Sequence, residues 1–155
     1  MTTAPNGIEL GHVVLYVRDL DASRAFYGDV VGWPVVATID LEGTRAVVFS
    51  GGRTHHELLL IEVGASAAPV PSGRRLGMYH FGIKIGDTDD ALRAMRDRLH
   101  RHHVTVVGSG DHTITHSLYV LDPDGNEVEL YVDVGDVDWA AHPELTIAPT
   151  RPLNL

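Results

Sequence analysis

The sequence predicts an α+β fold in which two βαβββ modules form a curved, cup-shaped mixed sheet with the helices outside. Two observations predict it. The segment HVVLYVRDLD, which begins at His12, reappears in altered form as HFGIKIGDTD at His80, and a helical stretch follows both copies. After each helical stretch come three short segments with the strand pattern of alternating apolar residues, divided by turn residues.

The first module is predicted to span about residues 8–63. Alternate residues of a strand belong to opposite faces, so Val13, Leu15 and Val17 share one face of the opening strand and His12 belongs to the other. The three later strands are expected near 34–40, 44–50 and 55–63.

A helix is predicted after the opening strand. Asp19 or Asp21 is suited to cap its N-terminus, and Gly32 is suited to end it. Helical spacing predicts four core contacts, namely Ala22, Ala25, Phe26 and Val30.

The second module, about 78–134, repeats this order. Its elements are expected at 79–85 (strand), 88–101 (helix), 104–107, 115–121 and 127–133 (strands). Residues 64–77 are small, contain proline and lack a pattern, which is typical of a linker. The tail, 135–155, carries the apolar anchors Trp139, Leu145 and Leu153, so we expect it to pack along the surface of a single domain, 1–155.

Composition narrows the function. The formal net charge of −9 argues against a nucleic-acid partner, because phosphate binding needs clustered Lys and Arg. There is no cysteine, so any metal must be held by nitrogen and oxygen ligands. No signal-peptide pattern or membrane-length apolar run is present, and we expect a cytoplasmic protein that does not bind membranes.

Three residues of the repeat suggest a metal site. His12, His80 and Glu129 each alternate with fully apolar neighbours that can pack against helices. All three are therefore expected on the opposite face of the sheet, inside the cup. Two histidines and one carboxylate form the ligand set of a non-haem metal site with open coordination positions.

The last strand of the first module, HHELLLIEV, adds a fourth candidate. If Leu59, Ile61 and Val63 make its helix-packing face, His56 faces the cup and Glu57 points away from it.

These segments resemble the vicinal oxygen chelate superfamily, which includes glyoxalase I, fosfomycin-resistance proteins, bleomycin-binding proteins and type I extradiol dioxygenases. Within it, RTHHELLL, RLGMYHFGIKI and SGDHTITHSLYVLDPDGNEVELY are most similar to the catechol 2,3-dioxygenase branch. The resemblance covers almost the whole chain. Many extradiol enzymes have four modules, whereas this sequence has two.

The resemblance implies metal-dependent extradiol cleavage of a catechol-type diol by dioxygen, in aromatic catabolism, by a homo-oligomer. It implies Fe(II), or else Mn(II), bound by His12, His80 and Glu129. It implies His56 as the acid/base residue. Tyr119 and His112 are implied as catalytic residues that contact the substrate, with His116 as a rival for the place of His112.

Three alternatives stay open. A glyoxalase-like isomerase needs a fourth ligand from the first module, for which Glu57 or Glu62 is available if the predicted strand face is reversed. A thiol transferase uses the same kind of triad. A metal-free small-molecule (antibiotic) binding protein would leave the triad unused.

Overall fold

The computed structural model describes residues 7–135 and 137–155, so residues 1–6 and 136 of the predicted domain and tail lie outside the described part. The chain divides into two compact units. The N-terminal unit contains the described residues up to Pro71 together with Asp122–Asp124, and the C-terminal unit contains Ser72–Leu121 and the described part of Gly125–Leu155. The boundary after Pro71 lies inside the predicted linker. Each unit is described by itself below.

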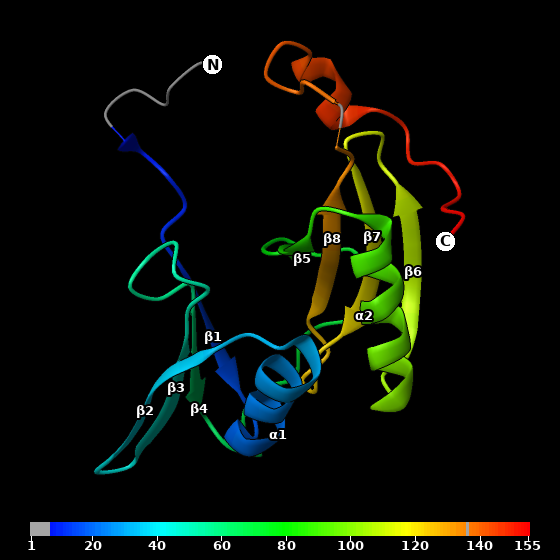
Figure 1. Ribbon diagram of the computed structural model, residues 1–155. Helices are drawn as coiled ribbons and strands as arrows, with labels where there is room; N and C mark the ends of the chain where they lie inside the picture. The colour runs from blue at the N-terminus through cyan, green and yellow to red at the C-terminus, as the bar shows by residue number, and fades with distance from the viewer. Residues whose placement is uncertain (1–6, 136) are drawn as a thin grey trace. The chain divides into compact units, whose positions relative to one another are not determined.

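The N-terminal unit contains one mixed sheet with the strand order β1-β4-β3-β2. β1 runs parallel to β4, and the other neighbours are antiparallel. Its elements are β1 (Val13–Val17), α1 (Leu20–Arg24), the π-helical segment η2 (Ala25–Val31), β2 (Val35–Leu41), β3 (Thr44–Phe49) and β4 (Leu58–Glu62) (Figure 1).

The C-terminal unit repeats this plan with the strand order β5-β8-β7-β6, and β5 runs parallel to β8. Its elements are β5 (His80–Gly86), α2 (Asp89–Arg101), β6 (Val106–Asp111), β7 (Thr115–Leu121), β8 (Glu127–Asp133) and the 3₁₀ turn η3 (Pro143–Ile147). The α+β class and the βαβββ order are confirmed, as two four-stranded mixed sheets. No helix in the described ranges is long and apolar enough to cross a membrane.

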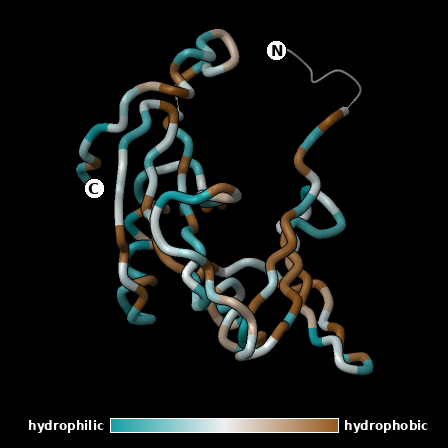
Figure 2. The backbone as a smooth tube through the Cα atoms, turned by 180° about the vertical axis from the view of Figure 1, so that it is seen from behind, coloured by the Kyte–Doolittle hydropathy of each residue, from teal (hydrophilic) through white to brown (hydrophobic). Residues whose placement is uncertain are grey.

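Alternation along the strands separates a buried face from an accessible one. In β8, Val128, Leu130 and Val132 are at most 1% exposed, and the residues between them are half-buried. The buried face packs against α2, whose Leu92 and Leu99 are fully buried. Figure 2 shows hydrophobic residues recurring along the strands of both units.

The first helix begins and ends as predicted, but its buried stripe differs. Asp19 caps it by accepting a hydrogen bond from the Ala22 amide at 3.0 Å, and Gly32 ends it at φ 89°. Ala22 and Ala25 are exposed, whereas Tyr27 is fully buried beside Phe26 and Val30. Ala22 lies in the regular turn before the π-helical segment, and the buried residues of that turn are Leu20 and Ser23.

The end of the tail packs on the body, as predicted. Arg151 forms a single antiparallel bridge with Asp111, at the end of β6. Leu145 and Leu153 are half-buried, but Trp139 is 60% exposed.

A buried hydrogen bond stabilises the N-terminal unit. The Tyr27 hydroxyl donates to Oδ2 of Asp122 at 2.8 Å, and both residues are nearly inaccessible. Burial, followed by the charge and hydrogen bond of Asp122, raises the pKa of Tyr27 well above its usual value.

We expect Tyr27→Phe to lower the free energy of unfolding by about 1.5–3 kcal/mol near pH 7, because a buried hydrogen bond to a carboxylate is lost. The raised pKa of Tyr27 also means that stability falls as pH rises above about 10, where the unfolded state releases this proton first. Tyr27→Phe removes that part of the alkaline loss. Urea unfolding at several pH values measures both effects, with Tyr16→Phe, 71% exposed, as the control. Equal stability of the two variants would contradict the prediction.

Candidate functional site

Four of the predicted site residues come together in the C-terminal unit. Parallel pairing sets Gly82 opposite Glu129 and His80 opposite Glu127, and antiparallel pairing sets Tyr119 opposite Glu129. Residues paired in this way share a face of the sheet. His80, Tyr119 and Glu129 therefore extend from the face opposite to the α2 core.

Both ring nitrogens of His80 lie near carboxylates. Nε2 is 3.4 Å from Oε2 of Glu129, and Nδ1 is 3.2 Å from Oε1 of Glu127. Nδ1 is buried, and its contact with Glu127 does not have the geometry of a hydrogen bond. The His80 imidazole thus lies between two carboxylates.

Glu129 also ends a chain of hydrogen bonds. The Tyr119 hydroxyl donates to Oε1 of Glu129 at 2.9 Å, and Nε2 of His112 lies 2.8 Å from the same hydroxyl. Burial, and then the hydrogen bond to Glu129, raise the pKa of Tyr119. The phenol therefore stays protonated near neutral pH and acts as a donor.

His116 does not belong to this group. It pairs with Val132 on the helix side of the sheet, and its Nδ1 lies 2.6 Å from Oδ1 of Asp89 in the first turn of α2. Of the two rival histidines, His112 is therefore the one that contacts Tyr119.

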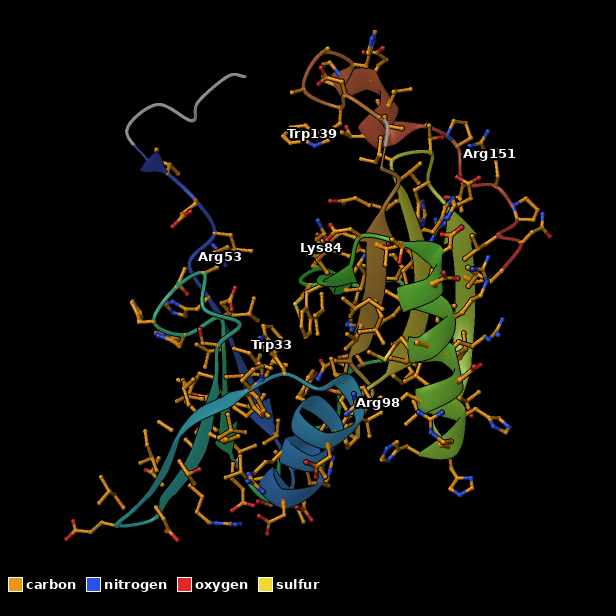
Figure 3. All side chains as sticks on the ribbon, viewed as in Figure 1. Trp33, Arg53, Lys84, Arg98, Trp139 and Arg151 are labelled. Carbon is orange, nitrogen blue, oxygen red and sulfur yellow. The ribbon has the colours of Figure 1, made fainter. Side chains whose placement is uncertain are left out.

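A pocket of about 730 Å³ adjoins Glu129 in the same unit. Tyr131 and Asp133 continue its wall along β8, and Trp139 belongs to its tail side. The other lining residues are Asp87, Ile114, Thr115, Val134, Gly135, Val137 and Thr146. The Lys84 ammonium (labelled in Figure 3) contacts the carboxylates of Asp87 and Asp133 at 2.5 Å each, so its single positive charge is shared between the two acids and one negative charge remains. The pocket has room and apolar surface for an organic ligand.

The remaining two predicted site residues meet in the N-terminal unit. His12 directly precedes β1, His56 lies shortly before β4, and their ring centroids are 4.2 Å apart. Nδ1 of His56 also lies 2.5 Å from Nδ1 of His55. Desolvation, and then the proximity of His12 and His55, lower the pKa of His56.

The predicted faces of β4 are wrong. Leu58 and Leu60 are fully buried, and they pair with Val13 and Leu15 on the helix side. Glu62 shares their face, because its Oε1 accepts a hydrogen bond from the amide that opens α1. The reason is that residues 55–57 precede the strand instead of continuing it, so their polarity carries no information about its faces.

Within the residues that the structure describes, no group of three or more His, Asp or Glu side chains is arranged to hold a metal ion. The predicted triad divides between the units. His80 and Glu129 form a pair in one of them, and His12 belongs to the other.

Residues 9–130 match the sequence model of the glyoxalase/bleomycin resistance protein/dioxygenase superfamily. The chain belongs to this superfamily.

Relatives within the superfamily have different activities. A catechol-2,3-dioxygenase of Bacillus subtilis is 33% identical over 139 residues, which are 90% of this chain but 46% of that protein. A probable lactoylglutathione lyase of Vibrio parahaemolyticus is 30% identical over 77% of this chain and 86% of its own length. The chain thus spans less than half of the dioxygenase.

The fold agrees with solved members of the superfamily. The crystal structure of a glyoxylase/bleomycin resistance protein/dioxygenase domain from Frankia sp. EAN1pec has a TM-score of 0.66 at 21% identity, covering 84% of this chain and 99% of that one.

Sequence reasoning missed two residues of this superfamily member's candidate site. Glu127 could have been found, because it precedes Glu129 by two positions and so shares its face. Thr150 could not, because its contact with His112, at 3.1 Å, joins the tail to a distant hairpin.

In metal-free protein, we expect His56 to titrate below its ordinary pKa of about 6.5. Replacing His12 by Ala should raise the pKa of His56 part of the way back, because the electrostatic effect of His12 is removed while desolvation, the larger cause, remains. NMR titration of the imidazole signals measures both values. Identical titration of His56 in the parent and in His12→Ala would mean that the 4.2 Å ring contact is absent in solution.

Proposed function

We propose that this chain carries out metal-dependent extradiol cleavage of a catechol-type diol by dioxygen. The observation that carries the proposal is the grouping of four side chains, His80, Glu129, Tyr119 and His112. His80 and Glu129 can bind a metal cation, and the Tyr119 phenol beside them can form a hydrogen bond with a hydroxylated ring. The similarity to catechol-2,3-dioxygenase supports the same reaction.

Two of the three proposed ligands, His80 and Glu129, are spaced to suit a divalent metal ion. Two donors about 2.1 Å from one ion lie about 3.0–3.4 Å apart, and Nε2 of His80 is 3.4 Å from Oε2 of Glu129. Histidine ligands usually donate their other ring N–H to a carboxylate, and Glu127 stands 3.2 Å from Nδ1 of His80. His12 is the third ligand that the resemblance implies. Fe(II) is the first candidate and Mn(II) the second, because a site of two histidines and one carboxylate with open positions suits both.

The chain's own side chains have distinct proposed roles. A bound ion would supply positive charge that lowers the pKa of a catechol hydroxyl. Tyr119 and His112 would orient the diol through hydrogen bonds. His56, whose pKa is lowered, is neutral near pH 7 and can accept a substrate proton and return it later.

The pocket beside Glu129 supports a diol that carries a ring substituent. At about 730 Å³ it exceeds what one small ring fills, and its tail side presents the Trp139 indole.

A comparison of the two repeats weighs against the isomerase. The residue that follows each repeated histidine pairs with Leu58 in one sheet and with Val128 in the other. Leu59 therefore occupies the position that Glu129 has in the second repeat. A leucine cannot bind a metal, so the first repeat lacks the matching ligand.

The two acids in or just before β4, Glu62 and Glu57, already have partners. Glu62 lies on the helix side, with Oε1 2.8 Å from an Arg45 guanidinium nitrogen. The Glu57 carboxylate accepts hydrogen bonds from the Gly51 amide and from Nε of Arg53. The thiol transferase and the metal-free binding protein stay alternatives, and the homo-oligomer, the cytoplasmic location and a role in aromatic catabolism stay predictions.

We expect the purified chain, loaded anaerobically with Fe(II) or Mn(II), to bind about one ion and to turn catechols yellow with oxygen uptake when air is admitted. His12→Ala, His80→Ala and Glu129→Ala should each lose metal affinity by more than about 100-fold, beyond the usual cost of changing an outer residue. His142→Ala, whose side chain is 61% exposed, is the control.

Metal analysis and an oxygen electrode, with catechol, 3-methylcatechol and biphenyl-2,3-diol, provide the measurements. Full metal content in all three variants would show that these residues do not bind the metal. A metal-loaded parent that consumes no oxygen with any diol would refute ring cleavage.

His56→Ala separates ring cleavage from the other metal chemistries. It should leave metal content intact and slow catechol turnover by about 10²- to 10⁴-fold, the usual contribution of a positioned acid/base group. Steady-state kinetics and metal analysis on the same preparation test this, again beside His142→Ala. Loss of metal would make His56 a ligand, and undiminished turnover would remove its catalytic role.

A further inference from the structure

The last residues of the tail are fixed against the end of β6. The Asp111 amide donates to the Arg151 carbonyl at 3.0 Å, and the Arg151 amide donates back at 2.8 Å. The Arg151 guanidinium adds a contact of 3.2 Å to the Asp111 carboxylate, and Figure 3 shows Arg151 beside the end of this strand. The neighbouring residue, Thr150, is thereby held over the strand end.

Glycine at position 110 permits this close approach. A Cβ atom there would lie 2.7 Å from Cγ2 of Thr150 and 3.0 Å from Nε2 of His112. Any larger residue would separate the tail from the histidine. The result is a contact of 3.1 Å between Oγ1 of Thr150 and Nδ1 of His112.

The direction of the hydrogen bonds follows from the acceptor at the far end. An ionised Glu129 can only accept hydrogen bonds, so the Tyr119 hydroxyl donates its hydrogen bond to this carboxylate. The Tyr119 oxygen must then accept from Nε2–H of His112. Nδ1 of a neutral ring is left as an acceptor, and the Thr150 hydroxyl is the donor that lies beside it.

We propose that Thr150 is a positioning residue that holds His112 as the Nε2–H tautomer, with that N–H directed at the Tyr119 oxygen. The expected effect of Thr150 on turnover rests on the proposed ring cleavage, whereas its effect on the tautomer of His112 does not. Without the hydroxyl, Nδ1 loses its donor and the other tautomer or a flipped ring becomes accessible. One hydrogen bond corresponds to a factor of about two to ten in such populations.

The test compares Thr150→Val, which keeps the shape and removes the hydroxyl, with Thr150→Ser, which restores it. Thr105→Val, an exposed threonine just before β6, is the matched control. Long-range proton–nitrogen NMR of metal-free protein reports the tautomer of His112, assigned by the loss of its signals in His112→Gln. We expect Nε2–H in the parent, in Thr150→Ser and in Thr105→Val, and a mixture in Thr150→Val.

Kinetics with a catechol form the second arm. Thr150→Val should lower kcat about two- to tenfold, and Thr150→Ser should recover it. An unchanged Nε2–H signature in Thr150→Val, or a mixture that Thr150→Ser does not correct, would overturn the proposal. A parent that shows the expected tautomer but cleaves no catechol would refute the proposed function and leave the positioning role standing.

Discussion

Side-chain alternation across the parallel pair of β5 and β8 is the constraint on which the site depends. The buried residues Val128, Leu130 and Val132 fix which face of β8 meets α2. A slip of one residue would bury Glu129 among leucines, and an unpaired carboxylate in an apolar core costs several kcal/mol. The packing of the core thus decides that Glu129 stands beside His80.

The two repeats use one scaffold for different purposes. In the C-terminal unit, the face away from the helix carries Glu127 and Glu129. In the N-terminal unit, the equivalent strand presents Leu59, and the neighbouring strand presents the exposed Tyr16. His12 is the polar exception on this side of the N-terminal sheet. It lies directly before β1, at a strand end where pairing with neighbours is incomplete, and it adds an imidazole to an otherwise apolar face.

The order of strands and helices could be predicted because period-2 and helical patterns recur in both halves. β7 and β8 have the predicted limits, since alternation there is uninterrupted. The faces of β4 could not be predicted, because Leu58 to Ile61 are all apolar and the polar residues before them lie outside the strand. The buried stripe of the first helix was misjudged because Leu20 and Ser23, and not Ala22 and Ala25, are its buried residues in the first turns.

The residues of the candidate site could be predicted from the sequence, but the contacts among their side chains were harder to predict. His112 and His116 look alike in the sequence, and only the alternation of β7 sends His116 to the helix side. The link to Thr150 depends on contacts between distant segments, which no local pattern encodes. Once these contacts exist, the Glu129 carboxylate sets the direction of every hydrogen bond in the series from Thr150 to Glu129. Because an ionised carboxylate can only accept hydrogen bonds, each group before it donates toward Glu129, and both nitrogens of His112 have a partner that favours one tautomer.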